Sequence, residues 1–365
     1  MLSLVDKERW VKMDKMTQFK NWAAQLKKAG CSSISWNTSD HLTLWGRNFD
    51  FHQWIPETEG LFIPKQTPFY TLGNAIEKNI DASTSVVTQH AIVGVGTTIA
   101  QSTPVLYDGL NDAGLMGGML YFVEEAKYAA KAQPGTLPLQ AVYVVTYLLS
   151  QCSTIDDIQK AIHQQITIVE QEMVGQHFQL HWMFTDKNNE SAVLECTKNG
   201  VKLYRHTMGI LTNSPNYDWQ LKNLYQFKNI TNQPNEPFEI NGTSIQPYCT
   251  GTSQFGIPGD SSAPSRFVRA AMLKRFAIQA RGEKQGILYL LKLFQNLQYI
   301  KGMVYPNPVD TEYTLYTAMG CAQTLNYYIT TYDSNQICRL SLNQLKDETK
   351  IKTFALDQSC QFCDL

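Results

Sequence analysis

The sequence predicts an α+β protein in which two mainly antiparallel sheets stack face to face and helices cover their outer faces. Strand-like runs dominate both ends of the chain, from CSSISW (31–36) to QICRLSLN (336–343). Helix-like runs such as LPLQAVYVVTYLLSQC (137–152) and KQGILYLLKLFQNL (284–297) lie between these ends. Because a sheet and a helix each bury one apolar face, this order favours packed layers with the helices outside.

Taken in order, the elements begin with a hairpin, in which CSSISW and HLTLWGRNFDF (41–51) flank the turn-forming residues NTSD. Further strand-like runs occupy 85–96, 106–111, 115–122, 178–186, 191–196, 201–206, 312–320 and 324–333. Two more helices are predicted, one at 153–166 with Ser153 as its cap and one at 264–279 with a proline near its start. The polar segment 229–247 is predicted to be a long loop.

Composition limits the function classes. Charged residues make up 17% of the 365 residues and the formal net charge is −1, so neither nucleic acid nor an anionic membrane is expected as the main partner. The longest apolar runs, such as 141–149, are too short to span a bilayer. Of the eight cysteines, Cys360 and Cys363 form a CxxC pair without the second pair or nearby histidine of a zinc site. We expect one domain over 31–365, with no metal and no organic cofactor.

Residues 1–30 differ from the rest of the chain. Charges interrupt every apolar stretch, which excludes a secretory signal and a lipoprotein signal before AGC (29–31). Apolar residues recur every three to four positions from Trp10 to Leu26, and seven basic residues accompany three acidic ones. A leader or propeptide helix, packed on the body or partly unfolded, is favoured over a helix on a membrane surface. Without a signal, the cytoplasm is the default location.

Cys31 has several conceivable roles, namely a lipidation site, half of a disulfide, a buried apolar thiol or a nucleophile. If the Gly30–Cys31 peptide bond is cut, Cys31 acquires an α-amine whose pKa of about 7.7–8 lies just below the thiol's value of about 8.5. That amine can take the thiol proton, so one residue supplies nucleophile and base. Gly30 has no side chain to obstruct such self-cleavage. On its position alone, a buried inert thiol is the favoured alternative.

Two residues of the second hairpin strand strengthen the nucleophile hypothesis. Arg47 and Asp50, in WGRNFDF, are expected to fold back beside Cys31. An aspartate can orient the α-amine, and an arginine can stabilise the thiolate and lower its pKa. An exposed ion pair of little energetic value is the alternative. The chain has no serine-hydrolase elbow, zinc-protease, P-loop or dinucleotide motif, and His181 is interpreted as a core histidine.

These segments resemble a known family. CSSISW followed by WGRNFDF resembles the start of the choloylglycine hydrolase and penicillin V acylase family, the linear-amide branch of the N-terminal-nucleophile (Ntn) hydrolases. Further similar segments, in the family's order, are LYDGLNDAGLMGGMLYF (106–122), LHWMFTDKNNESAVLEC (180–196), LTNSPNYDWQ (211–220), GIPGDSSAPSRFVRA (256–270) and EYTLYTAMGCAQTLNYYITTYDSNQI (312–337). The resemblance covers 31–365 and implies a four-layer αββα sandwich.

The resemblance also implies six catalytic residues, which are Cys31, Arg47, Asp50, Tyr121, Asn213 and Arg266. Cys31 is the expected nucleophile, with the arginine of the hairpin beside its thiol and the aspartate holding its amine. The Asn213 side chain and the backbone N–H of Tyr121 are expected to donate to the oxyanion. Arg266 is expected to stabilise the negative charge that develops during the reaction. Arg269, one turn away, is the alternative for that role.

Tyr121 bears on the choice of substrate. Family members that prefer conjugated bile salts tend to carry Asn at this position, and penicillin V acylases carry Tyr. Because an aromatic face suits a flat acyl group, a penicillin V-like amide is placed ahead of a conjugated bile salt. N-acyl homoserine lactones and other N-acyl amides are further alternatives. The apolar side chains expected to line the acyl pocket, with core packing as the alternative for each, are Phe49, Trp54, Leu61 and Phe62.

The expected reaction is therefore hydrolysis of a small-molecule N-acyl amide through an acyl-thioester. While residues 1–30 are attached, the α-amine of Cys31 does not exist. Either these residues are a propeptide that self-cleavage removes, or the true translation start lies further along the sequence. The rival from another class is a non-catalytic protein of the same fold, tethered through the basic leader. Segment 229–247 resembles the assembly loop of tetrameric relatives, so a homo-oligomer, tetramer or dimer, is expected.

Overall fold

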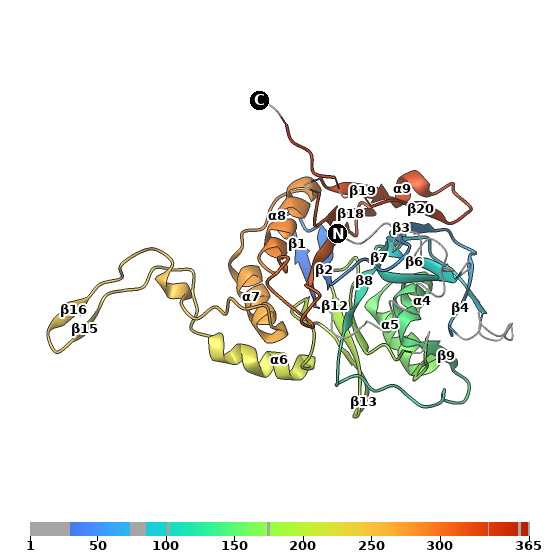
Figure 1. Cartoon of the computed structure of the whole chain (residues 1–365), viewed down its shortest axis with the longest axis horizontal. Helices are drawn as coiled ribbons and strands as arrows, with labels where there is room; N and C mark the ends of the chain where they lie inside the picture. Colours follow the sequence, from blue (N-terminus) through green and yellow to red (C-terminus); the bar gives the residue numbers. More distant parts are fainter. Residues whose placement is uncertain are drawn as a thin grey trace.

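The computed structural model describes residues 30–73, 85–100, 103–173, 176–334, 336–356 and 359–363. Apart from Gly30, the leader predicted over 1–30 lies outside the described residues. Two large antiparallel sheets pack against each other at the centre of the described part (Figure 1). Apolar side chains fill the space between the sheets, and the largest fully buried ones include Trp45 and Trp182.

The first sheet has six strands in the order β14-β1-β2-β17-β18-β19. Their bounds are β1 Cys31–Asn37, β2 Thr43–Phe51, β14 Ile210–Leu211, β17 Tyr313–Cys321, β18 Asn326–Thr331 and β19 Cys338–Ser341. β1 and β2 form the predicted hairpin, with Cys31 opposite Phe49. On the other side of β2, Thr314 of β17 lies opposite Asp50. Antiparallel pairing thus brings the second hairpin strand back beside Cys31, as the sequence predicts.

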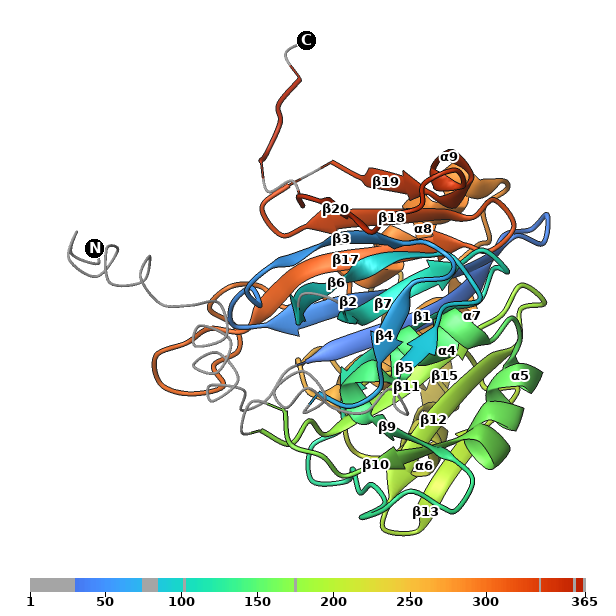
Figure 2. The same ribbon diagram turned by 90° about the vertical axis from the view of Figure 1, so that its right-hand side faces the viewer.

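The second sheet has eight strands in the order β13-β12-β11-β8-β7-β6-β3-β20. Their bounds are β3 Thr58–Ile63, β6 Ile92–Ala100, β7 Thr103–Asn111, β8 Met116–Tyr121, β11 Leu180–Thr185, β12 Ser191–Thr197, β13 Gly200–Tyr204 and β20 Lys352–Phe354. Smaller pairs are formed by β4 Pro68–Tyr70 with β5 Ser85–Val87, β9 Leu137–Gln140 with β10 Ile166–Val169, and β15 Phe238–Ile240 with β16 Thr243–Ile245. Figure 2 shows β19 and β20, the edge strands of the two sheets, together at one end of the molecule.

Helices cover the outer faces of the two sheets. α7 Ala263–Phe276 and α8 Glu283–Gln295 contact the first sheet, and α4 Val144–Gln151 contacts β7 and β8 of the second. Figure 1 shows α4 and α5 on the side opposite to α7 and α8. The other helical segments are α5 Ile155–Lys160, α6 Tyr217–Leu224 and α9 Leu342–Leu345, with short turns η2 Ala141–Tyr143, η3 Ala161–Gln165, η4 Tyr225–Phe227 and η5 Thr252–Gln254. The predicted four-layer αββα sandwich is confirmed.

Two local predictions are corrected. The cap of α5 is Thr154 and not Ser153, because the Thr154 hydroxyl accepts from the backbone N–H of Asp157 while the Asp157 carboxylate accepts from the backbone of Thr154. The predicted loop at 229–247 contains the β15–β16 hairpin, which projects away from the sheets as an arm (Figure 1). Throughout the described residues, helices stay too short or too polar to cross a membrane.

Candidate active site

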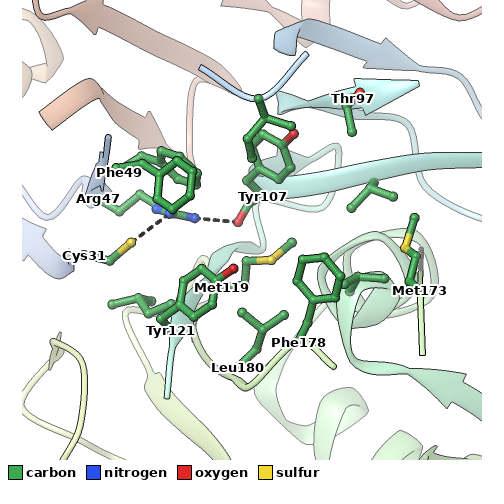
Figure 3. A pocket seen from close by; sticks show the side chains of 15 residues that line it. Cys31, Arg47, Phe49, Thr97, Tyr107, Met119, Tyr121, Met173, Phe178 and Leu180 are labelled. Atoms are coloured by element: carbon green, nitrogen blue, oxygen red, sulfur yellow. Dashed lines mark hydrogen bonds between the residues drawn. The ribbon is translucent and has the colours of Figure 1, made fainter. Parts of the chain in front are cut away.

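Cys31 lies at the start of β1, and its side chain is 1% exposed. Its Sγ accepts a hydrogen bond from Arg47 Nη2 at 3.2 Å (Figure 3). Burial raises the pKa of this thiol, and the charge of Arg47 is the largest influence in the opposite direction. A cation that is hydrogen-bonded to sulfur favours the thiolate, which is the nucleophilic form of cysteine.

Arg47 is fully buried and is held in place by the second sheet. Its Nη1 donates to the carbonyl of Tyr107 at 2.8 Å and lies 3.4 Å from Asp108 Oδ2. Asp108 in turn accepts hydrogen bonds from the hydroxyls of Tyr316 and Tyr327. Burying a cation costs free energy unless an anion lies nearby. Asp108 therefore stabilises the buried Arg47 and holds its guanidinium toward the sulfur.

Asp50 is also buried, and burial raises the pKa of its carboxyl, opposed first by Arg266. Oδ1 accepts from the Thr314 hydroxyl at 2.5 Å, whereas Oδ2 is buried without a hydrogen-bond partner among the described residues. The amide N–H of Cys31 donates to Asn213 Oδ1 at 2.8 Å and not to this carboxylate. In the uncut chain, therefore, Asp50 has one acceptor oxygen unused.

The side-chain amide of Asn213 joins three parts of the site. Its Nδ2 donates to the carbonyl of Tyr121 at 2.9 Å, and its Oδ1 accepts from Arg266 Nη2 at 2.7 Å as well as from the Cys31 amide. Arg266 lies on α7, is 1% exposed and also donates to the carbonyl of Cys31. Because Arg266 donates to Oδ1, the Nδ2 end of the amide faces Tyr121. Arg266 therefore orients the Asn213 side chain directly.

The backbone N–H and C=O of Tyr121 lie on the side of β8 where the Asn213 side chain is bound. Tyr121 lies opposite Leu180 of β11, and the neighbouring Phe122 N–H donates to the carbonyl of Gln179 at 2.8 Å. Hydrogen-bonded and non-hydrogen-bonded pairs alternate along antiparallel strands, so the N–H and C=O of Tyr121 both point away from β11. The C=O reaches Asn213 on that side, which places the Tyr121 N–H and the Asn213 amide at one edge of β8.

An apolar cavity begins at the sulfur. It encloses about 580 Å3 of space, part of which is open to the solvent. In Figure 3 Cys31 lies at one end, Met173 and Thr97 lie at the other, and the rings of Phe49 and Tyr121 lie on opposite sides. The lining residues are Cys31, Arg47, Phe49, Phe51, Ile55, Thr97, Val105, Tyr107, Met119, Leu120, Tyr121, Val142, Met173, Phe178 and Leu180.

Of the four predicted pocket residues, Phe49 alone lines this cavity. Its ring stacks on Tyr316 at 5.2 Å between centroids. Trp54 also stacks on Tyr316, with 6.0 Å between ring centroids, and packs against the core. Leu61 and Phe62 are buried in β3, paired to β6 and β20, so core packing explains them. The placement of Trp54, Leu61 and Phe62 in the acyl pocket is therefore corrected.

The remaining candidates have structural roles. Arg269 donates to the backbone carbonyls of Pro258 and Asn296, so the alternative for the Arg266 role is not supported. His181 is fully buried, lies 3.2 Å from Glu195 and stacks on a phenylalanine ring, as a core histidine does. Within the described ranges no three His, Cys, Asp or Glu residues converge as metal ligands. Cys360 and Cys363 are both exposed.

Comparison with known proteins decides the family. A sequence profile described as linear amide C-N hydrolases, choloylglycine hydrolase family, matches residues 31–354. The chain belongs to the choloylglycine hydrolase family. It is therefore a hydrolase that acts on carbon–nitrogen bonds in linear amides, built on the Ntn-hydrolase fold, and the predicted family is confirmed.

Similar proteins cover this chain to different extents. A bile salt hydrolase/transferase from Lactiplantibacillus plantarum is 30% identical over 335 residues, 91% of this chain and 98% of that protein. The crystal structure of a variant of the conjugated bile acid hydrolase from Clostridium perfringens superposes with a TM-score of 0.82 at 25% identity, covering 92% of this chain and 99% of the other. A penicillin V acylase from Pectobacterium atrosepticum is 26% identical over 170 residues, 45% of this chain and 39% of that protein.

Proposed function

We propose that Cys31, once freed from residues 1–30, hydrolyses linear amides whose acyl group is apolar. The observation that carries this proposal is the position of its sulfur, at one end of an apolar cavity and hydrogen-bonded to a buried arginine. The cavity receives the acyl group, and the amine portion lies toward the solvent. Small-molecule amides are the class of substrate that fits such a site.

The reaction begins when the free α-amine of Cys31 takes the thiol proton. The sulfur attacks the amide carbon and the carbonyl oxygen becomes an oxyanion, for which the backbone N–H of Tyr121 and Nδ2 of Asn213 are the donors. The nitrogen of the substrate takes the proton and leaves as an amine, so a thioester joins the acyl group to the enzyme. Water then attacks this thioester and releases the acid and the thiol.

Asp50 has a matching role in the cut chain. Cleavage turns the amide nitrogen of Cys31 into an amine. The amine carries additional N–H protons, and these need hydrogen-bond acceptors that the uncut chain does not need. Oδ1 of Asn213 already accepts from this nitrogen, and Oδ2 of Asp50 is buried and unused among the described residues. A carboxylate and an amide oxygen together orient the amine and favour its charged form when it holds the proton.

Two acyl classes deserve testing. The relative from Lactiplantibacillus plantarum, which aligns with 91% of the chain, is named for bile salts, while the penicillin V acylase from Pectobacterium atrosepticum aligns with 45% of it. The Tyr121 ring on the cavity wall favours the flat phenoxyacetyl group of penicillin V. We therefore propose conjugated bile acids as one substrate class and penicillin V-like amides as the second candidate, which the tyrosine supports.

Replacing Tyr121 by Asn separates these candidates. The change keeps the backbone N–H but removes the aromatic face, which is worth about 0.5–1.5 kcal/mol to a stacked ring. We expect the ratio of kcat/KM for penicillin V to that for glycocholate to fall about threefold to tenfold. Steady-state kinetics on both substrates measure this ratio, and Tyr225→Asn, at an exposed tyrosine, is the control. An unchanged ratio would show that the ring does not select the acyl group.

We also propose that the arm mediates homo-oligomer formation with a second copy of the chain. Phe238 and Ile240 on β15 are 59% and 57% exposed, which is unusual for apolar side chains on a hairpin that projects from its domain. A Phe238→Ser/Ile240→Ser chain should show a lower mass in light scattering after size exclusion than the parent, because its apolar contact area is lost. Glu239→Ser on the same strand is the control. A parent chain that is monomeric at micromolar concentration contradicts this proposal.

A further inference from the structure

Gly30, the residue before the nucleophile, is buried and both of its peptide groups are bound by the catalytic domain. Its N–H donates to Oε1 of Glu312, and its carbonyl oxygen accepts from the backbone N–H of Asp50 at 3.0 Å. Glu312 immediately precedes β17, 282 positions along the chain. The domain therefore contains specific partners for the residue that the proposed cleavage would remove from Cys31.

Glu312 is placed where a carboxyl group is costly. Its side chain is 4% exposed, and burial raises its pKa to about 8, with the hydrogen bond from Gly30 acting in the opposite direction. Buried carboxyl groups persist where a partner compensates their desolvation. The backbone N–H of Gly30 is such a partner, and the hydrolysis of a substrate amide as described above makes no use of this carboxyl.

Tyr299 makes the same position selective for glycine. A Cβ added to Gly30 would lie 2.8 Å from the ring carbons and hydroxyl of Tyr299, closer than real contacts allow. The ring cannot easily give way, because its hydroxyl donates to the carbonyl of Ser261 at 2.7 Å and its backbone N–H donates to Thr314 at 2.9 Å. Any larger residue before Cys31 must displace this anchored ring.

The Gly30 carbonyl directly precedes Cys31 in the chain and is held by the backbone of β2. The Asp50 N–H that binds the Gly30 oxygen also acts to lower the pKa of the Cys31 thiol. This backbone N–H therefore holds the oxygen that would carry negative charge after attack and also favours the thiolate. This donor is distinct from Asn213, whose Oδ1 accepts from the amide N–H of Cys31.

We infer that Glu312 and Tyr299 form a binding site for the residue preceding the nucleophile, which selects glycine there and positions its carbonyl beside Cys31 for self-cleavage. The inference rests on the proposed function of Cys31. Sγ attacks the Gly30 carbonyl carbon, the C–S bond forms and the C–N bond breaks, and the Cys31 nitrogen ends with the thiol's proton. Water then cleaves the thioester to give a Gly30 carboxylate and a free thiol.

Intact-mass spectrometry of the full chain, sampled over time after synthesis, measures the loss of residues 1–30. Glu312→Ala should slow this loss about tenfold or more, since it removes the acceptor of the Gly30 N–H. Glu312→Gln keeps an acceptor oxygen at the same place and should restore the rate to within about threefold of the parent. Rescue by glutamine distinguishes positioning from general destabilisation, and thermal melting checks that each variant folds.

Gly30→Ala provides a second arm that leaves every side chain of the domain intact. We expect it to slow the loss of residues 1–30 about tenfold to a hundredfold, and Tyr299→Ala in the same chain should recover at least about tenfold by making room for the added methyl. Parent rates in both Glu312→Ala and Gly30→Ala, or equal slowing by Glu312→Ala and Glu312→Gln, would overturn the inference. Loss of residues 1–30 from Cys31→Ala would instead overturn the proposed role of Cys31, so the two failures are distinguishable.

Discussion

A full chain carrying Cys31→Ala should keep residues 1–30 and hydrolyse amides at least about 10⁴-fold more slowly than the parent, because both reactions use the same sulfur. The alanine removes the nucleophile and the acceptor of the Arg47 hydrogen bond, while the backbone contacts of β1 with β2 and β14 persist. Intact mass reports the leader, and release of free amine from penicillin V or glycocholate reports hydrolysis.

The control for this variant is Cys249→Ala, because Cys249 is an exposed free cysteine far along the chain. It should keep the parent's activity and mature mass. Cys31→Ser adds a second comparison, since a hydroxyl loses its proton to an amine much less readily than a thiol does and hydrolysis should be slower. Amide hydrolysis by a Cys31→Ala chain, or by a chain whose Cys31 nitrogen is still joined to Gly30, would mean that another group is the nucleophile.

Replacing Asn213 should give the second large loss. Asn213→Ala removes a donor for the oxyanion and the acceptor of the Cys31 nitrogen, so kcat is expected to fall about 10²- to 10³-fold. Asn213→Asp keeps the acceptor but replaces the Nδ2 donor to the Tyr121 carbonyl with an oxygen. Two oxygens then face each other, so the aspartate should be no better than the alanine in kcat.

Asn223→Ala on α6 is the matched control, because it removes an asparagine amide that makes no contact with the site and bonds only weakly to Gln226 at 3.4 Å. Its kcat and its KM should both equal those of the parent. The measurement needs chains that have already lost residues 1–30, verified by mass, so that slow processing is not counted as slow hydrolysis. A fall in kcat of less than about fivefold in Asn213→Ala would remove this side chain from the oxyanion site.

Local sequence patterns sufficed for the hairpin that forms the centre of the site. Antiparallel pairing follows from two strand-like runs around a turn, and it places Arg47 and Asp50 on the strand beside Cys31. Asn213, Tyr121 and Arg266 came instead from a resemblance of motifs, since they lie on segments far apart in the sequence. The structure brings all three together through the Asn213 amide.

Other parts of the site carry no such pattern. Asp108 lies within the segment 106–122, but its function as the anion behind Arg47 depends on two sheets facing each other. Glu312 begins the segment 312–337 and Tyr299 follows a helix, and no local pattern indicates that either contacts Gly30. The prediction that Leu61 and Phe62 line the pocket fails for a different reason. Their sheet is covered on both faces, so apolar residues on either side of a strand are buried in the core.

By itself, the sequence determined the layered α+β fold, the hairpin that begins with Cys31 and the chemistry that a terminal cysteine can perform. These follow from short-range periodicity and from the bonding capacity of single residues. The tertiary structure alone decided which side chains wall the cavity, which anion accompanies Arg47 and what holds Gly30. Those outcomes depend on contacts between segments separated by up to 282 positions, whose distances no local pattern encodes.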